Sequence, residues 1–166
     1  MVREGEFTSV IYGHIRDQKY KDAISILNQH LLAHSSNRAA LSLLGYCLYQ
    51  LQDYVSASDC YEQLANLYPE VENYKLYFAK SLYKADLFQP AMKVAAQIED
   101  PNYRDKVIKL QAAIRYKEED FAGARSLIDE CASTDVDSII NLGCLCFCEK
   151  NYQQACELFQ QAQHVS

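Results

Sequence analysis

The 166-residue sequence predicts an all-α fold made of about five helix-turn-helix repeats stacked in a line. The main observation is an aromatic residue followed three positions later by alanine, a pair that recurs after 34, 34, 33 and 31 residues. The five pairs are Tyr20/Ala23, Tyr54/Ala57, Phe88/Ala91, Phe121/Ala124 and Tyr152/Ala155. A period close to 34 residues is typical of paired helices that stack into a solenoid. The second observation is a shortage of glycine (five) and proline (three), which turn-rich β folds need.

Ten helices are expected, two in each repeat. Their ranges are 5–16, 20–33, 38–51, 54–67, 72–84, 88–98, 104–117, 121–131, 137–149 and 152–164. Asn37, Pro69 and the runs at 100–102 (Asp-Pro-Asn) and 133–135 (Ser-Thr-Asp) separate them, because these residue types break or cap helices. The repeats then cover about residues 4–37, 38–71, 72–104, 105–135 and 136–166. We expect them to form a single domain, since 166 residues is an ordinary domain size.

The pattern within each repeat identifies the repeat type. In the second repeat, the first helix carries Leu41, Leu44, Gly45 and Leu48, and the second carries Tyr54, Ala57, Tyr61 and Leu64, before Pro69. The small site recurs as Gly45, Ala79, Ala112 and Gly143, where the lack of bulk lets the two helices of a repeat approach; Ile11 replaces it in the first repeat. These are the signature residues of the tetratricopeptide repeat. The sequence therefore predicts a right-handed superhelical tetratricopeptide solenoid with an atypical first repeat.

No polar helix follows the last repeat, although a solenoid needs a polar cap at each end. We therefore expect the chain to be part of a longer array, or an oligomer that covers this end. The longest apolar runs are far shorter than a membrane span requires, and the start of the chain has no apolar signal segment. The net charge of −6 argues against general nucleic-acid binding, which depends on a basic surface.

No catalytic or metal site is expected. Cys144, Cys146 and Cys148 alternate on one helix without the Cys-x-x-Cys spacing of zinc sites, and buried free thiols fit them better. The four histidines are scattered, no Ser or Cys carries a nucleophile motif, and the glycines are isolated, so no phosphate loop exists. The chain is therefore expected to be a binding protein without a cofactor, not an enzyme.

The inner surface of the solenoid is the expected binding surface, because first helices line it in tetratricopeptide proteins. Aromatic residues recur four positions after the small site, and two tyrosines on neighbouring first-helix positions extend the stripe. The predicted groove consists of Tyr12, Tyr46, Tyr49, Lys80, Tyr83, Lys84, Lys109, Tyr116 and Phe147. For any single ring, the ordinary alternative is packing between helices. For the lysines, the ordinary alternative is a charged face exposed to solvent.

Charge adds a second property to this groove. Residues 73–117 contain nine basic and four acidic side chains, whereas the remainder of the chain is acidic. We expect an extended protein segment as the ligand, apolar or Pro-rich with some acidic residues. The clamp that some tetratricopeptide chaperone adaptors use for a terminal carboxylate is not expected, because Ala113 stands where an asparagine should accompany Lys109.

Several stretches exceed what the repeat demands and resemble the tetratricopeptide subunit of the intraflagellar transport B complex, the fleer type. They are Gly5-Glu6-Phe7-Thr8, Ile15-Arg16-Asp17 with Tyr20, Leu41 to Cys47 (LSLLGYC), Cys60 to Leu64 (CYEQL), Leu82 to Ala85 (LYKA), Leu110 to Ile114 (LQAAI) and Asn141 to Leu145 (NLGCL). The resemblance spans essentially the whole chain and implies the amino-terminal portion of a longer protein.

The resemblance also implies a function. It implies a scaffold subunit of the cytoplasm and cilium, whose superhelix wraps an extended Pro-rich stretch of another core subunit. It further implies a role in cilium assembly and in polyglutamylation of axonemal tubulin. The alternative that the residues leave open is a cytosolic tetratricopeptide adaptor or co-chaperone for peptide ligands.

Overall fold

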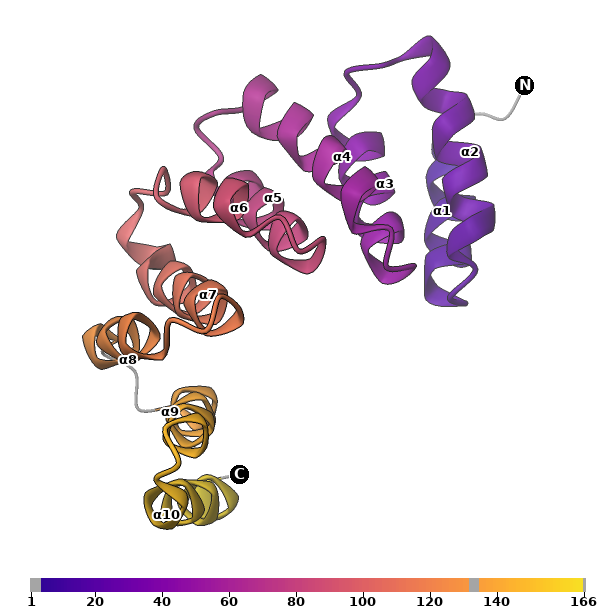
Figure 1. Ribbon diagram of the computed structural model, residues 1–166. Coiled ribbons are helices and arrows are strands. Elements are labelled where there is room, and N and C mark those ends of the chain that lie inside the picture. Colours follow the sequence, from indigo (N-terminus) through magenta and orange to yellow (C-terminus); the bar gives the residue numbers. More distant parts are fainter. Residues whose placement is uncertain (1–3, 132–134, 166) are drawn as a thin grey trace. The chain divides into compact units, whose positions relative to one another are not determined.

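The structure is a computed structural model that describes residues 4–131 and 135–165. Its described part consists of ten α-helices and one short 3₁₀ helix, without strands. The α-helices are α1 (Glu4–Arg16), α2 (Tyr20–Ala33), α3 (Arg38–Gln50), α4 (Tyr54–Leu67), α5 (Glu72–Lys84), α6 (Phe88–Ala95), α7 (Arg104–Lys117), α8 (Phe121–Glu130), α9 (Val136–Cys148) and α10 (Tyr152–Val165). Figure 1 labels them in chain order. The predicted all-α tetratricopeptide solenoid class is confirmed.

One helix ends earlier than expected. The sequence predicts a helix over 88–98, but α6 stops at Ala95. Asp100 precedes Pro101, a position that disfavours helical backbone, and its side chain accepts a hydrogen bond from the Asn102 backbone N–H (2.9 Å). The 3₁₀ helix η1 (Pro101–Tyr103) follows and leads into α7. All other helix ends lie within one residue of their predicted positions.

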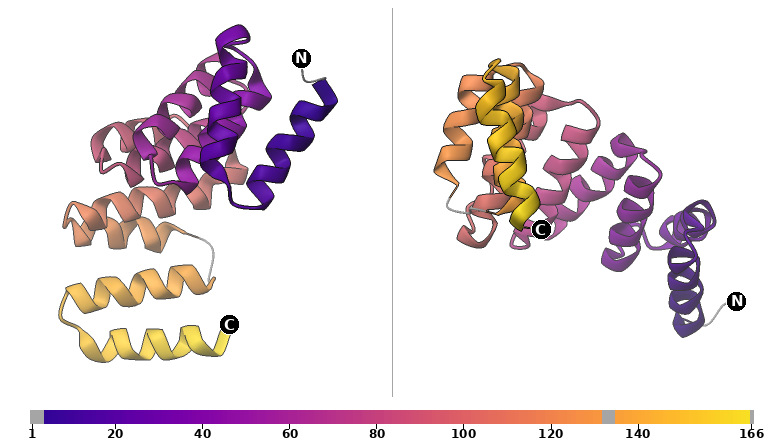
Figure 2. Two further views of the ribbon diagram at one scale, coloured as in Figure 1. Left: turned by 90° about the vertical axis from the view of Figure 1, so that its right-hand side faces the viewer. Right: turned by 90° about the horizontal axis from the view of Figure 1, so that it is seen from below.

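The chain divides into two compact units, Met1–Val94 and Ala95–Ser166, and each is described by itself. The single domain expected from the sequence stays a prediction. In the first unit, α2 packs on α3, α3 on α4 and α4 on α5. In the second unit, α7 packs on α8 and α9 on α10. Figure 2 shows α9 and α10 running antiparallel side by side.

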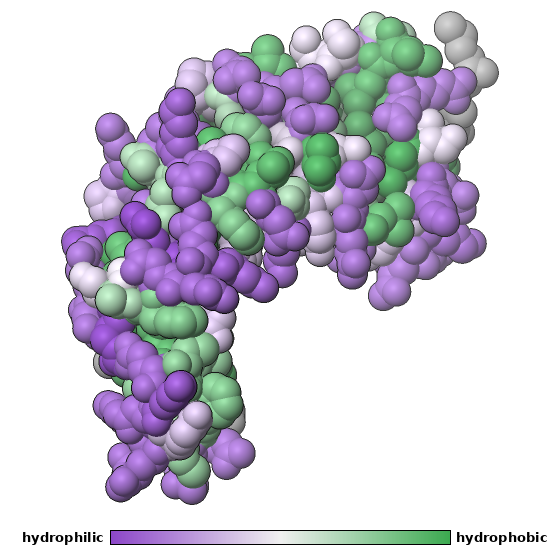
Figure 3. All heavy atoms as spheres, in the orientation of Figure 1, coloured by the Kyte–Doolittle hydropathy of each residue, from purple (hydrophilic) through white to green (hydrophobic). Residues whose placement is uncertain are grey.

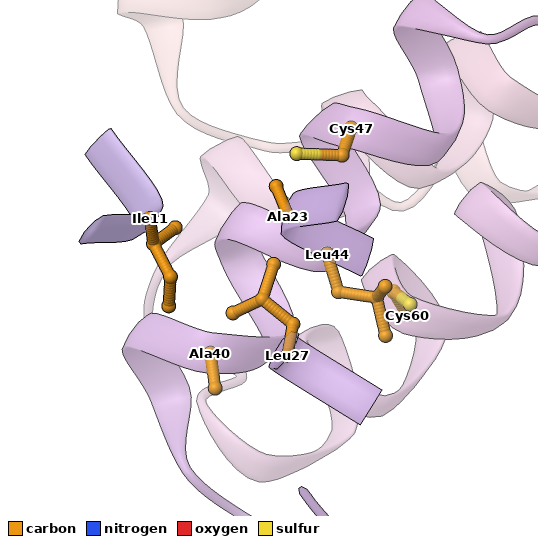
Figure 4. Close-up of a cluster of buried hydrophobic side chains, with 7 residues drawn as sticks. All are labelled: Ile11, Ala23, Leu27, Ala40, Leu44, Cys47 and Cys60. Atoms are coloured by element: carbon orange, nitrogen blue, oxygen red, sulfur yellow. The ribbon is translucent and has the colours of Figure 1, made fainter. Parts of the chain in front are cut away.

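The core of the first unit lies between successive helices. One cluster joins α1 to α4 and consists of Ile11, Ala23, Leu27, Ala40, Leu44, Cys47 and Cys60 (Figure 4). A second cluster joins α3, α4 and α5 through Leu41, Ala57, Tyr61, Leu64 and Tyr74. Burial raises the pKa of the Cys47 thiol to about 11, as expected for a cysteine that acts as a small apolar side chain.

The second unit combines apolar packing with a polar tie. Ala112, Ala124, Ile128 and Leu145 form its buried cluster, across α7, α8 and α9. Arg125 of α8 donates hydrogen bonds to the Glu149 carboxylate, with Nε 3.1 Å from Oε1, and to the Cys146 sulfur, with Nη2 3.3 Å from Sγ. The hydrogen bond from Arg125 lowers the pKa of Glu149. This tie fixes α8 to the end of α9.

All five hairpin turns share one backbone motif. The residue two positions before each second helix has a left-handed backbone, with φ between 57° and 63°, and none of these residues is glycine. They are Gln18, Gln52, Asp86, Glu119 and Lys150. The backbone N–H of the following residue returns to a carbonyl five positions earlier, as Asp53 does to Leu48 (2.9 Å). This pattern is the Schellman motif, which usually takes glycine at this position.

Candidate functional site

The first unit has a pocket of about 430 Å³ between α3, α4 and α5, here called the α3–α5 pocket. Tyr46 and Tyr49 line it from α3, Tyr61 from α4, and Tyr77, Lys80 and Ser81 from α5. Three of the predicted groove residues therefore meet in one hollow: Tyr46, Tyr49 and Lys80. Ser81 and Tyr77 were not among the predicted site residues.

The pocket depends on close packing between the two helices of the second repeat. A Cβ added at Gly45 would lie 3.0 Å from Tyr61 Cζ, so the glycine makes room for this ring. The Tyr61 ring in turn packs on Tyr77, with ring centroids 5.3 Å apart. Gly45 thereby lets Tyr61 connect α3, α4 and α5 beneath the pocket, which agrees with the role predicted for the small site.

Two polar groups of the pocket lack hydrogen-bond or ion-pair partners among the described residues. Ser81 has 0% exposed surface, and its hydroxyl has no hydrogen-bond partner among the described residues. Lys80 is half-buried and forms no ion pair within the described part of the chain. No carboxylate is among the side chains that line the pocket. The pocket is therefore aromatic and carries one uncompensated positive charge.

A smaller pocket of about 150 Å³ lies between α1, α2 and α3. Tyr12, which is 56% exposed, lines it together with Ile11, Leu27 and Leu43. Leu43 also lines the α3–α5 pocket, so the two hollows adjoin along α3. Figure 3 shows hydrophobic side chains gathered among hydrophilic ones on the surface of this unit. The structure therefore brings Tyr12 and Tyr46 to neighbouring hollows.

The recurring aromatic residue has a structural partner in every repeat from the second onward. Its ring packs against the first residue of the next helix, with centroids 5.1 to 6.0 Å apart: Tyr49 on Tyr54, Tyr83 on Phe88, Tyr116 on Phe121 and Phe147 on Tyr152. Tyr49, Tyr83 and Tyr116 are half-buried, whereas Phe147 is 58% exposed. Burial raises the pKa of Tyr49 and Tyr83. An aromatic pair spaced five residues apart is a signal visible in the sequence, and it indicates this packing.

The remaining predicted residues have different surroundings. Lys84 on α5 is exposed. In the second unit, Lys109 of α7 is not free, because it forms an ion pair with Asp135, which caps the start of α9 by accepting a hydrogen bond from the Ser138 backbone N–H. The hydroxyl of Tyr116 lies 3.1 Å from Cys148 Sγ, and this hydrogen bond raises the pKa of Tyr116 to about 12. Lys109 and Tyr116 thus connect α7 to the two ends of α9.

The Lys109–Asp135 contact predicts a pH dependence. The hydrogen bonds from Lys109 and Ser138 lower the pKa of Asp135 from 3.8 to about 2. The contact therefore stabilises the fold above pH 3.8 and loses this contribution as the pH falls toward 2. Urea unfolding at several pH values should show a smaller acid-induced loss of stability in Asp135→Asn than in the wild type. Asp129→Asn, at an exposed site on α8, serves as the control and should behave like the wild type.

The described residues form neither a metal site nor a membrane-spanning helix. Among them, no three His, Cys, Asp or Glu side chains gather in a way that could hold a metal ion. The cysteines of the described residues form no disulfide bond with one another. None of the described helices combines the length and the apolar character needed to cross a membrane.

Comparison with known proteins supports both the fold and the resemblance. Residues 38–71 match the tetratricopeptide repeat family model. Intraflagellar transport protein 70A of Xenopus tropicalis is 49% identical over 99% of this chain, the Danio rerio protein of the same name 46%, and intraflagellar transport protein 70B of Mus musculus 45%. The chain spans about a quarter of the length of these relatives (25–26%).

Solved structures with this architecture include MamA from Desulfovibrio magneticus RS-1, with a TM-score of 0.81 at 13% identity, covering 99% of this chain and 97% of that one. YrrB, described as a tetratricopeptide protein with an unusual peptide-binding site, has a TM-score of 0.69 at 16% identity, covering 97% and 85%. At these identities the likeness concerns the fold alone. The family resemblance predicted from the sequence is confirmed by the relatives.

Proposed function

Because this chain is homologous over 99% of its length to the intraflagellar transport 70 proteins, we propose that it is a non-catalytic scaffold of the intraflagellar transport B machinery. The observation that carries the proposal is this homology, at 42–49% identity. The proposal places the protein in the cytoplasm and the cilium and gives it a part in cilium assembly. We further propose a role in the polyglutamylation of axonemal tubulin.

The proposed partner is an extended segment of another core subunit, bound along α1, α3 and α5. The two adjoining pockets support this, because they offer apolar hollows on successive first helices. Exposed tyrosines suit apolar segments, and Pro-rich segments in addition lose little conformational entropy on binding because they are already extended. Lys80 and Lys84 favour acidic residues in the segment. The second unit has aromatic side chains of its own for a partner segment, Tyr116 and Phe147, whereas its Lys109 is already paired with Asp135.

The test is quantitative co-purification from ciliated cells with the tagged chain. The wild type should recover intraflagellar transport B subunits, and the double reversal Lys80→Glu/Lys84→Glu should reduce their recovery about tenfold, because it opposes the charge of an acidic segment. The matched control Lys21→Glu/Lys93→Glu makes the same change of charge at exposed positions on α2 and α6, and should recover them normally.

Two outcomes contradict the proposal in different ways. If the double reversal recovers as much partner as the wild type, the binding surface is not along α5. If the wild type instead recovers heat-shock chaperones and no transport subunits, the protein is a cytosolic adaptor or co-chaperone.

A further inference from the structure

We propose that the α3–α5 pocket binds the carboxylate of an aspartate or glutamate in the partner segment, with the Ser81 hydroxyl as hydrogen-bond donor and the Lys80 ammonium group as counter-charge. This inference rests on the proposed function, since it names the chemistry that one pocket of that surface recognises.

The buried Ser81 hydroxyl makes no hydrogen bond among the described residues. A buried hydroxyl without a partner is unfavourable, because it has lost its hydrogen bonds to water and gained none. Ser58, another buried serine of this unit, avoids this by donating to the Val55 carbonyl (2.7 Å). Ser81 lines the pocket and makes no such bond in the described structure. An acceptor brought by a ligand would satisfy it.

The charge of Lys80 differs in its surroundings from that of other lysines on first helices. Two other lysines in first helices already have carboxylate partners: Lys75 pairs with Glu72 and Lys109 with Asp135. Lys80 has no such partner among the described residues, although it is half-buried and lies beside Ser81 on α5. An ammonium group partly removed from water and facing aromatic walls favours an anion.

The groups that line the pocket determine which anion fits. The donors are one ammonium group, the Gln50 amide and hydroxyls, without an arginine to hold a phosphate dianion in two-point contact. The walls formed by the rings of Tyr46, Tyr49 and Tyr77 are apolar apart from their hydroxyl groups, and they can contact the methylene groups of a side chain. A single carboxylate on a short apolar stem matches this combination.

Ser81 is covered in the free chain, so binding requires a small movement at the rim. Tyr46 and Tyr77 are 42% and 40% exposed, and side-chain rearrangement of this size is common at interfaces. The backbone of the partner then runs across the pocket while one acidic side chain enters it.

The test uses two acetylated and amidated proline peptides with a single central residue, glutamate in one and glutamine in the other. Fluorescence anisotropy with the purified chain should give about tenfold tighter binding of the glutamate peptide. Lys80→Gln and Ser81→Ala should each reduce this preference to about threefold or less. Lys75→Gln and Ser58→Ala are matched controls on α5 and α4 and should keep the full preference.

A thermal readout separates binding from folding. Because Ser81→Ala removes an unsatisfied buried hydroxyl, its melting temperature should equal that of the wild type or exceed it by about 2–4 °C. Ser58→Ala, which loses a hydrogen bond, should not gain stability. Weaker carboxylate preference in a variant that is at least as stable as the wild type identifies Ser81 as a ligand-binding group.

The inference is overturned if both peptides bind equally, if neither binds, or if the preference survives in both Lys80→Gln and Ser81→Ala. These results leave the scaffold proposal to its own co-purification test. Continued recovery of transport subunits by Ser81→Ala, together with equal binding of the two peptides, would contradict carboxylate binding in the pocket and still support the scaffold function.

Discussion

Replacing Leu64 by alanine is expected to lower the free energy of unfolding by about 3–4 kcal/mol. Leu64 has 0% exposed surface and belongs to the cluster that joins α3, α4 and α5. Its neighbours there include the Tyr61 and Tyr74 rings, which cannot collapse freely into the space that a shortened side chain leaves. The cost therefore combines lost burial with a residual cavity. Urea unfolding monitored by circular dichroism measures it.

The same helix offers a matched control. Leu67 ends α4 and is 47% exposed, so Leu67→Ala should change the free energy of unfolding by at most about 0.5 kcal/mol. Equal losses from both variants would mean that the cluster does not hold the repeats together. Because Tyr61 also lines the α3–α5 pocket, Leu64→Ala should weaken peptide binding as well.

The second large effect is expected for Gly45→Val, at about 2–3 kcal/mol of destabilisation. A Cβ at this position would lie 3.0 Å from Tyr61 Cζ and 3.3 Å from Cys60 Cβ, before the two valine methyl groups are added. Both neighbours are buried, so neither can move without disturbing the core. Thermal and urea unfolding should both report the loss.

Replacing a glycine that has no close neighbours should have the opposite effect on the free energy of unfolding. Gly13 in α1 has no atom within 4 Å of an added Cβ, and its backbone is not left-handed. Gly13→Ala should therefore raise the free energy of unfolding by about 0.5–1 kcal/mol through helix propensity alone. A gain in stability from Gly45→Val would show that the small site is not needed for close packing.

The helices could be predicted because the same residue pattern recurs in all five repeats. Small residues such as Gly45 mark where helices approach, and capping residues such as Asn37 and Asp135 mark where helices begin. Both signals are local, so nine helices fall within one residue of their predicted ends. The tenth, α6, ends at Ala95, where the backbone turns through a hydrogen bond from the Ile98 N–H to the Ala95 carbonyl (3.2 Å), and the helical pattern does not reveal this early end.

The candidate site was only partly predictable, because its chemistry depends on pairs that are distant in the sequence. The repeat pattern placed Tyr46, Tyr49 and Lys80 on inner faces, and these three do share a pocket. Lys109 was expected to line the same groove, but it forms an ion pair with Asp135. The two residues are 26 positions apart in the sequence, and the repeat pattern cannot reveal such a pair. That Ser81 lacks a partner becomes visible only when every neighbouring donor and acceptor is placed.

The five left-handed corners have a mechanical consequence. Left-handed backbone disfavours side chains such as those of Gln52 and Glu119 by roughly 1–2 kcal/mol per residue. The helices that flank a corner must supply that energy through their contacts with each other. A helix that separates from its partner would release the corner between them at the same moment, so each hairpin should open and close as one piece.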